Sequence, residues 1–205
     1  MSETTNIHHA LAIIADAAGT SGWALGGSAA LLLRGIPLEA PPRDIDLYCD
    51  QARLDSLHLA LAPYATDSPA YSETPIYRST LSHYVIGACK VELVTDFQVD
   101  AHGCRYRVDV AGFLVPFGDE AELELSETRH SGSPRVRVAP LAHELLFNVL
   151  RGRADRISTI AEAMGREAER QERLLAELEA RNEITSEISA QMRCLLGGER
   201  AWTQR

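Results

Sequence analysis

The strongest constraint on the fold is a short apolar segment that ends in two glycines and is followed by a segment with two acids. The first reads Trp-Ala-Leu-Gly-Gly-Ser over residues 23–28, and the second reads Asp-Ile-Asp-Leu-Tyr-Cys over residues 44–49. We expect a strand, a turn at the glycine pair, and then a helix. Because side chains alternate across a strand, Asp44 and Asp46 are expected on one face of the second segment.

The glycine turn has the composition of a phosphate-binding site. At a junction between a strand and a helix, backbone N–H groups and the helix dipole favour an anion such as a triphosphate. Because Gly26 and Gly27 carry no side chains, phosphates can approach the backbone closely. Ser28 can add a hydroxyl contact, or it can simply cap the helix. We therefore predict nucleotide binding at these residues, with an ordinary turn as the alternative.

The acids of the second segment and one later acid predict a metal site. Mg²⁺ prefers oxygen ligands and usually takes one or two carboxylates together with substrate phosphates. Asp44 and Asp46 fit that preference. The alternative is that both side chains simply face solvent at the edge of a strand. Glu92 lies in the run Lys-Val-Glu-Leu-Val, where an acid is costly without a partner. We expect Glu92 to complete a two-metal cluster or to deprotonate an attacking hydroxyl.

Two further side chains share the expected face of the Glu92 strand. Asp96 has the same parity as Glu92 and is the alternative third acid. Lys90 also has that parity, so it can neutralise Glu92, contact a phosphate of the nucleotide, or lie in water at the strand end. It is the only lysine in the chain.

Composition predicts a cytoplasmic protein with its own apolar core. The 205 residues are 45% apolar, and the four cysteines form no Cys-x-x-Cys pair, which argues against a disulfide framework and a zinc site. No apolar run approaches the roughly 20 residues that cross a membrane, and the first residues lack a signal-peptide pattern. The net charge of −9 argues against a broad nucleic-acid surface, although a local basic patch can hold a small nucleic acid.

The pattern of the chain changes near Ala139. Residues 1–139 alternate strand-like and helical segments, which predicts an α/β domain, and residues 140–205 form a helical C-terminal region. Within the first part we expect a loop over residues 66–75 and a strand over residues 113–117.

Three further local predictions concern caps, turns and assembly. Asp50 is expected to cap a helix that follows it, and residues 122–127 are expected to form a hairpin with residues 135–138. Residues 167–196 are highly charged and helical in composition. They predict an amphipathic helix or a helix pair broken near Asn182 that covers the domain, or alternatively a coiled-coil contact in a homodimer.

Residues 26–28, residues 44–46 and Glu92 together resemble the signature of the DNA polymerase β-like nucleotidyltransferase superfamily. That signature is a glycine turn, an acid-x-acid strand and a later acid on another strand. The resemblance implies an α/β (α+β) palm with a small mixed sheet and a C-terminal helical subdomain. It also implies an enzyme that uses two Mg²⁺ ions and a nucleoside triphosphate, whose α-phosphate is attacked by an acceptor while pyrophosphate leaves.

The resemblance implies a role for each residue of the signature. Gly27 and Ser28 would hold the triphosphate, and Asp44 and Asp46 would bind the metals. Glu92 would bind the catalytic metal or serve as the base.

Within the superfamily the chain is similar to the minimal and abortive-infection-type bacterial enzymes. The similarity lies in the run Arg-Asp-Ile-Asp-Leu over residues 43–47 and in Pro-Leu-Ala-His-Glu-Leu-Leu over residues 140–146. The loop over residues 29–43 is longer than is usual for the family. Whether the glycine turn meets the acids therefore depends on how this loop folds back.

The sequence does not decide which molecule accepts the nucleoside monophosphate. A toxin-like enzyme of a toxin–antitoxin system that modifies an RNA such as tRNA is the first interpretation, and an enzyme that adenylylates an aminoglycoside-like drug fits the acidic charge. An enzyme that adenylylates a partner protein would also fit, as would a non-catalytic nucleotide-binding module of the same fold. An RNA would need a local cationic groove, for which the candidates are Arg78, Arg105, Arg107, Arg135, Arg137, Arg151 and Arg153.

Overall fold

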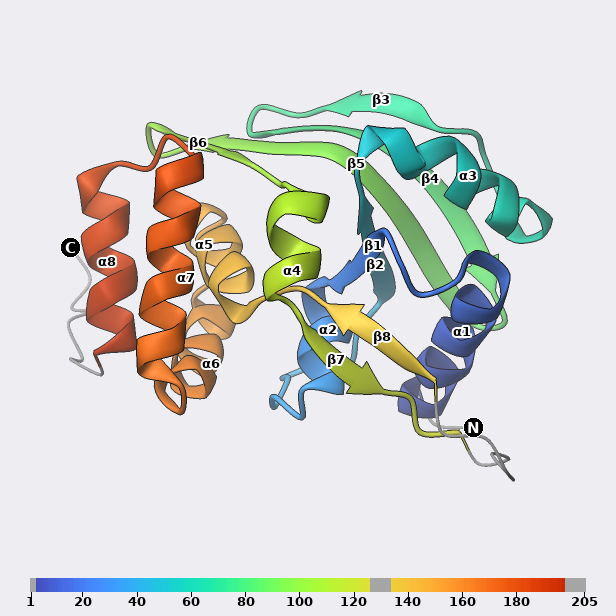
Figure 1. Cartoon of the computed structure of the whole chain (residues 1–205), viewed down its shortest axis with the longest axis horizontal. Coiled ribbons are helices and arrows are strands. Elements are labelled where there is room, and N and C mark those ends of the chain that lie inside the picture. Colours follow the sequence, from blue (N-terminus) through green and yellow to red (C-terminus); the bar gives the residue numbers. More distant parts are fainter. Residues whose placement is uncertain (1–2, 126–133, 198–205) are drawn as a thin grey trace.

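A mixed β-sheet forms the centre of the molecule, with helices packed on both of its faces (Figure 1). The computed structural model describes residues 3–125 and 134–197. Within these residues, eight strands are joined in the order β3-β4-β5-β2-β1-β8-β7, with β6 paired to β5. The strands are β1 (Trp23–Gly26), β2 (Asp44–Cys49), β3 (Ala70–Glu73), β4 (Tyr77–Ile86), β5 (Cys89–Ala101), β6 (Cys104–Arg107), β7 (Asp119–Glu122) and β8 (Arg135–Val138).

Figure 1 shows α5 to α8 at one end of the molecule, α1 and α3 near the other, and α2 and α4 between them. None of the helices in the described part of the chain has the length and apolarity that a membrane span requires. The helices are α1 (Glu3–Ala18), α2 (Gly27–Leu33), α3 (Gln51–Leu61), η1 (Ala62–Tyr64), η2 (Val110–Leu114), α4 (Val115–Phe117), α5 (Leu141–Leu150), α6 (Ala154–Gly165), α7 (Ala168–Arg181) and α8 (Ser186–Leu196).

The three central strands bring the glycine turn and the acids to the same level of the sheet. β1 runs antiparallel to β2 and places Gly26 opposite Asp46. β2 runs parallel to β5 and places Asp46 opposite Glu92. Residues 29–33 belong to α2, and residues 34–43 then return the chain so that β2 lies beside β1. The sequence-based prediction of an α/β fold with a mixed sheet is confirmed.

The two faces of β2 are occupied as its alternation predicts. Ile45 and Leu47 are buried in a core formed with α1 and α3. Tyr48 lies in a second core on the opposite face, together with residues of α5 to α8. Asp44 and Asp46 have the parity of Tyr48, so their side chains point away from the first core and toward the helical end of the molecule.

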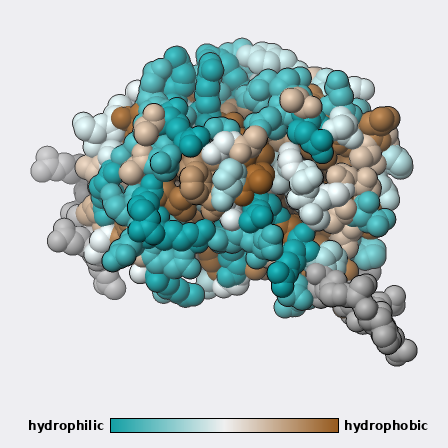
Figure 2. All heavy atoms as spheres, viewed as in Figure 1, coloured by the Kyte–Doolittle hydropathy of each residue, from teal (hydrophilic) through white to brown (hydrophobic). Residues whose placement is uncertain are grey.

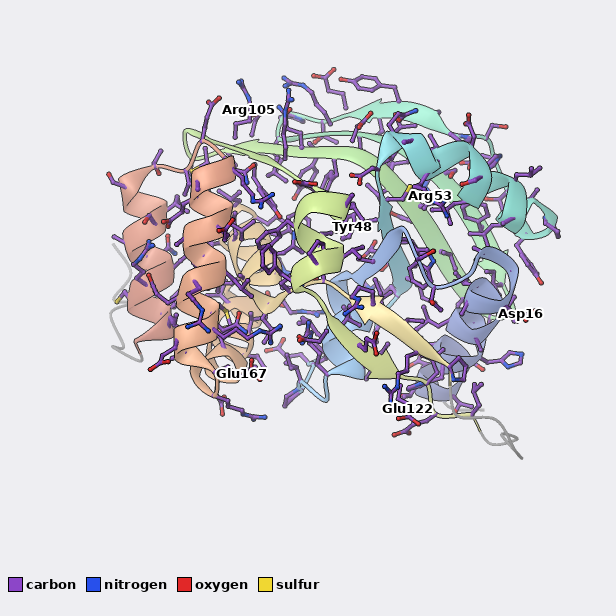
Figure 3. The ribbon with its side chains drawn as sticks, in the orientation of Figure 1. Asp16, Tyr48, Arg53, Arg105, Glu122 and Glu167 are labelled. Carbon is purple, nitrogen blue, oxygen red and sulfur yellow. The ribbon has the colours of Figure 1, made fainter. Side chains whose placement is uncertain are left out.

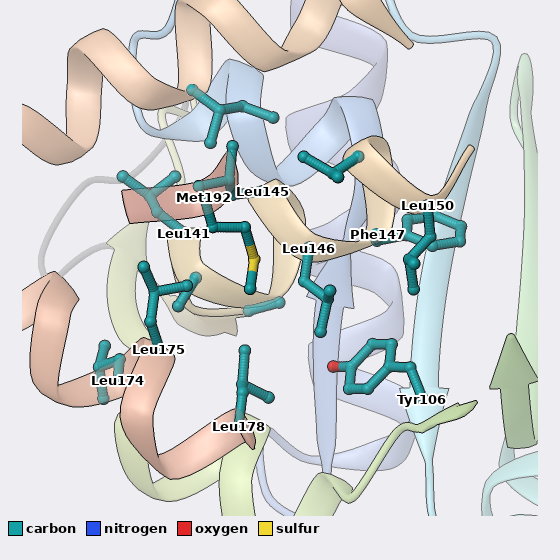
Figure 4. Packing of buried hydrophobic residues seen from close by; sticks show 14 of the residues in the cluster. Tyr106, Leu141, Leu145, Leu146, Phe147, Leu150, Leu174, Leu175, Leu178 and Met192 are labelled. Carbon is teal, nitrogen blue, oxygen red and sulfur yellow. The ribbon is translucent and has the colours of Figure 1, made fainter. Parts of the chain in front are cut away.

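The second core extends across residue 139, where the sequence predicts a domain boundary. All ten residues of α5 are buried, because this helix contacts β5, α6, α7 and α8. Figure 4 shows the apolar residues of α5 beside those of α7, Met192 of α8 and Tyr106 of β6. The division into residues 1–139 and 140–205 stays a prediction, and the two parts share one apolar core.

Residues 167–196 form a helix pair, which is one of the two arrangements expected from their sequence. The break lies at Asn182, whose side chain donates a hydrogen bond to the Leu178 carbonyl and accepts one from the Arg107 N–H. The apolar residues Leu174, Leu178, Ile188 and Met192 are buried inside the chain. The pair therefore covers the second core. A homodimer contact stays a prediction, and it would have to use other side chains.

Two predicted segments differ from the structure. Residues 113–117 are helical, within η2 and α4, because the Asp109 carboxylate accepts a hydrogen bond from the Gly112 N–H and starts a helical turn. A short apolar run does not by itself distinguish a buried helix from a strand. The loop predicted over residues 66–75 contains the edge strand β3, which pairs with β4.

Asp50 precedes α3 but does not cap it through its side chain. Its carboxylate instead accepts hydrogen bonds from the N–H groups of Val110 and Ala111, at 3.1 and 2.8 Å. Asp50 therefore occupies the predicted N-cap position of α3, but its side chain stabilises η2, which is distant in sequence.

The predicted hairpin is present in part. β7 and β8 pair antiparallel, with Glu122 opposite Arg135. The Leu123 N–H donates to the Pro134 carbonyl at 2.9 Å, which continues the pairing. Residues 126–133, which include the predicted turn, lie outside the described residues.

An ion triad ties the sheet to the helical end. Asp119 of β7 accepts hydrogen bonds from Arg34, which follows α2, and from Arg170 of α7. Arg34 also donates to the Ala139 carbonyl at 2.7 Å. Burial alone would raise the pKa of Asp119, but the two guanidinium groups hold it below the ordinary value.

Replacing Asp119 with asparagine should lower the free energy of unfolding by about 1–3 kcal/mol, because two partly buried guanidinium groups lose their carboxylate partner. Urea titration followed by circular dichroism measures the change. Asp16→Asn, at an exposed position of α1, is the matched control and should leave the unfolding midpoint in place. An equal effect of both substitutions would contradict the structural role of the triad.

Candidate active site

A cavity of about 610 Å³ opens between the sheet and the helices α5 and α6. This volume lies in the range of pockets that enclose one small molecule. Tyr48, which lines the cavity, lies near the middle of the molecule, whereas Asp16 and Glu122 lie at its outside (Figure 3). The residues of the sequence-predicted site that line the cavity are Gly27, Ser28, Asp44, Asp46 and Glu92.

Gly27 is the point at which the turn meets the acids. Its φ is +62°, in the left-handed region that residues other than glycine rarely adopt. A β-carbon at this position would overlap Oδ2 of Asp46. A β-carbon at Gly26 would likewise overlap the ring of Tyr48. The glycine pair is therefore needed for the turn to lie directly against β2.

The carboxyl groups around Asp46 disfavour its ionisation. Burial is the largest cause that raises the pKa of Asp46, to about 8, and the charges of Asp44, Glu92 and Glu144 act in the same direction. The pKa of Glu92 is also raised, first by burial and then by the charge of Asp44. A bound cation would restore the ionised form of these groups, because opposite charge favours a carboxylate.

The acids alone do not make a complete metal site, and a magnesium ion at this place would take its remaining ligands from a nucleotide and water. In the part of the chain that the structure describes, no group of three or more His, Cys, Asp or Glu side chains is arranged to hold a metal ion. Mg²⁺ usually binds through one or two carboxylates and fills its remaining positions with water and substrate phosphates. Asp44 and Asp46 supply two carboxylates on one face of β2. Glu92 lies opposite Asp46 on the neighbouring strand, at the usual spacing of about 4.8 Å between strands.

Glu144 is a buried acid of the site for which no role was predicted from the sequence. Its side chain is 1% exposed. Oε1 accepts a hydrogen bond of 2.8 Å from the Gly27 N–H, whereas Oε2 is buried with no hydrogen-bond partner among the described residues. Burial raises the pKa of Glu144 to about 7, although the hydrogen bond from the Gly27 N–H acts in the opposite direction. An acid within the apolar run of α5 is the same signal that singled out Glu92.

Arginines of the helical end face the acids across the cavity. Arg156 of α6 donates a hydrogen bond of 3.0 Å to Oγ of Ser28, so it reaches the glycine turn directly. Arg151 and Arg153 also line the cavity, and Arg153 pairs with Asp155 at 2.7 Å. Arg151 and Arg153 belong to the cationic candidates predicted from the sequence, whereas Arg156 was missed. No spacing in the sequence indicates that α6 lies beside Ser28.

Aromatic rings form the apolar wall of the cavity. The ring centroids of Phe97 and Phe147 are 5.4 Å apart, and Tyr48 stacks on Phe97 at 5.9 Å. Tyr77 contacts both phenylalanine rings, and the guanidinium of Arg151 lies 4.7 Å from the centroid of Phe147. Such a wall suits the stacking of a planar ring such as a nucleobase.

Lys90 and Asp96 lie outside this cavity. Lys90 is opposite Asp44 and lines a neighbouring cavity of about 510 Å³, so a phosphate contact from Lys90 stays a prediction. Asp96 is exposed and has a φ of +50°. The register of β4 and β5 shifts beside it, which breaks the alternation and turns Phe97 toward the cavity. Asp96 is therefore not the third acid of the site.

The other arginines predicted for a cationic groove do not reach this cavity. Figure 2 shows hydrophilic side chains over most of the face in view, with smaller apolar areas between them. The arginines outside the cavity contact acids or an amide instead: Arg78 with Glu73 and Asp100, Arg105 with Asp100 and Glu183, Arg107 with Gln98, and Arg135 and Arg137 with Glu120. Of the seven predicted arginines, Arg151 and Arg153 line this cavity, and a groove that holds an RNA stays a prediction.

Comparison with solved structures shows that the chain has a nucleotidyltransferase fold. A putative nucleotidyltransferase from Thermotoga maritima is 20% identical, with a TM-score of 0.55 over 77% of this chain and 92% of that chain. ANT(2″)-Ia in complex with adenylyl-2″-tobramycin is 20% identical, with a TM-score of 0.47 over 88% of this chain and 99% of that chain. No protein-family model matches the sequence, and no curated protein matches it significantly. Identities of this size show the fold alone.

Proposed function

We propose that the protein transfers a nucleoside monophosphate from a nucleoside triphosphate to an acceptor hydroxyl and releases pyrophosphate. The observation that supports this most directly is that Gly27, Asp46 and Glu92, which are far apart in sequence, meet at one wall of a single cavity. This arrangement joins a place for phosphates to a pair of carboxylates that suits Mg²⁺.

In the proposed reaction, Asp44 and Asp46 would hold Mg²⁺, and Glu92 would be a further ligand or the base. Two bound Mg²⁺ ions would neutralise the phosphate oxygens and align the attacking and leaving oxygens. Burial and the charge of Asp44 raise the pKa of Glu92, which makes it a stronger base for the proton of the acceptor hydroxyl than an ordinary carboxylate. The acceptor oxygen then bonds to the α-phosphorus, the bond to the bridging oxygen breaks, and pyrophosphate leaves.

The triphosphate is proposed to bind between the glycine turn and the arginines of the helical end. Gly27 and Ser28 offer backbone N–H groups and a hydroxyl at the start of α2. Arg156 contacts Ser28 directly and Arg151 lines the same cavity, and guanidinium groups bind phosphate oxygens in a bidentate manner. The aromatic wall with Phe97 is the proposed place for the base.

The charge around the cavity favours a small cationic acceptor, such as an aminoglycoside-like amine that carries hydroxyl groups. The net charge is −9, and the five predicted arginines outside the cavity already have acidic or amide partners. To bind an RNA, the protein would need cationic side chains without acidic partners that can contact the phosphates of the RNA backbone. The experiment therefore has to distinguish this acceptor from an RNA, as expected of a toxin, and from a partner protein.

The test is to incubate the protein with each α-labelled nucleoside triphosphate and Mg²⁺, in separate reactions with aminoglycosides, total cellular RNA and cellular protein. We expect label on an aminoglycoside and release of pyrophosphate, and no label when EDTA removes the metal. Label on RNA or on protein would show that the acceptor is that molecule and would contradict the small cationic acceptor. Nucleotide binding without transfer to any acceptor would contradict the enzyme and support a binding module.

A further inference from the structure

The glycine turn is held by side chains of the helical end. Glu144 of α5 accepts the Gly27 N–H at 2.8 Å, and Arg156 of α6 donates to the Ser28 hydroxyl at 3.0 Å. The two consecutive residues proposed to bind phosphates thus each contact a residue more than 100 positions away in sequence. The contact to Glu144 involves the backbone, so it restrains the path of the turn itself.

Burying the Glu144 side chain lowers the stability of the folded chain. A carboxylate 1% exposed, with one oxygen that has no hydrogen-bond partner among the described residues, destabilises the folded chain. A leucine at this position would avoid the cost of the unpaired oxygen, because most other core residues of the helix are apolar, but it would leave the Gly27 N–H without this acceptor. A polar side chain at residue 144 is therefore explained by its contact with the turn and not by the packing of α5.

The geometry around Gly27 explains what the acid can do. Oδ2 of Asp46 lies where a β-carbon of residue 27 would be, and Oε1 of Glu144 accepts the Gly27 N–H. Gly27 is thus held between a carboxylate of β2 and a carboxylate of α5. A φ of +62° needs such restraint, since glycine adopts many other conformations at little cost.

We propose that Glu144 is a positioning residue, which fixes the Gly27 amide so that the phosphate-binding turn and the metal-binding carboxylate of Asp46 keep one relative placement. This proposal rests on the proposed nucleotidyl transfer. Glu144 acts through the turn and does not itself react. The hydrogen-bond acceptor is the functional part of the side chain, so glutamine should replace glutamate and alanine should not.

The first measurement follows the Gly27 amide by NMR in protein labelled with ¹⁵N-glycine, without any nucleotide. In the wild type we expect slow hydrogen exchange and a downfield amide proton, because the N–H donates to a buried carboxylate. Protection should persist in Glu144→Gln and be lost in Glu144→Ala. Fast exchange at Gly27 in the wild type would overturn the proposal, even if Glu144→Ala failed to fold.

The second measurement compares kcat and KM for transfer. Glu144→Ala should lower kcat by about 10²-fold, the usual cost of a reacting group misplaced by about 1 Å. Glu144→Gln should retain kcat within about 5-fold, because an amide oxygen also accepts the Gly27 N–H. Gln171→Ala removes a similarly buried polar side chain of α7 away from the cavity, and it should leave kcat unchanged.

The outcomes separate this proposal from the proposed function. Normal kcat in Glu144→Ala would overturn the positioning role, as would a Glu144→Gln variant as slow as Glu144→Ala. If the wild-type protein neither binds nor transfers a nucleotide, the proposed function fails. The amide measurement then still decides whether Glu144 holds Gly27.

Discussion

Replacing Asp46 with asparagine should reduce nucleotidyl transfer by about 10³-fold or more, the scale expected when a group that stabilises transition-state charge is removed. Asp46 lies opposite both Gly26 and Glu92 in the sheet, so it is the carboxylate at which the turn and the third acid meet. Asparagine keeps the shape of the side chain but offers one neutral oxygen, which binds Mg²⁺ poorly. Pyrophosphate release under saturating Mg²⁺ and nucleotide measures the loss.

The control for this variant is Asp96→Asn. Asp96 lies on β5 as Glu92 does, but it is exposed and does not line the cavity. It should retain the transfer rate of the wild type. If Asp46→Asn transferred nucleotide at a normal rate, the assignment of the metal site to β2 would be wrong.

The same substitution should change how stability depends on pH in metal-free protein. In the folded chain the carboxyl of Asp46 has a pKa of about 8, whereas its ordinary pKa is 3.8. Between these values the folded state binds more protons than the unfolded state, so the free energy of unfolding falls as pH rises. Asp46→Asn should flatten this decline, and Glu144, with a pKa of about 7, should preserve part of it. Urea titrations at a series of pH values between the two pKa values of Asp46 measure the slope.

Gly27→Ala should lower the rate of nucleotidyl transfer strongly while it destabilises the folded protein only slightly. A methyl group at Gly27 would overlap Oδ2 of Asp46 and would also have to adopt a φ of +62°. The strain costs on the order of 1–2 kcal/mol, which a folded domain tolerates. The overlap would push the carboxylate away from the turn, and a displacement of about 1 Å at a reacting centre costs about 10²-fold in rate.

Gly87→Ala is the matched control for this prediction. Gly87 has a φ of +60°, but a β-carbon there meets no atom within 4 Å. The two variants should therefore lose similar stability, while Gly87→Ala transfers nucleotide at the normal rate. Thermal unfolding and the transfer assay together make the comparison. Equal rates in both variants would show that the approach of Asp46 to Gly27 has no role in catalysis.

Local patterns in the sequence predicted much of the site and of the central sheet. The alternation of β2 placed Asp44 and Asp46 on one face, and the acid within an apolar strand singled out Glu92. Both features depend only on residues that are close in sequence, so a local pattern is enough to predict them. The strand predicted over residues 113–117 was wrong because its helical form depends on Asp109 and on Asp50, whose carboxylate accepts the Val110 N–H from 60 positions away.

The sequence by itself determined the glycine turn, the pair of acids, Glu92 and the general α/β fold, because strand alternation and the cost of burying an acid act locally. Only the tertiary structure decided that the segment over residues 29–43, which begins within α2, returns β2 beside β1, and that a bulge removes Asp96 from the site. It also brought Glu144 and Arg156 to the turn. Those contacts depend on how α5 and α6 pack against the sheet, and packing between distant segments leaves no periodic pattern in a single sequence.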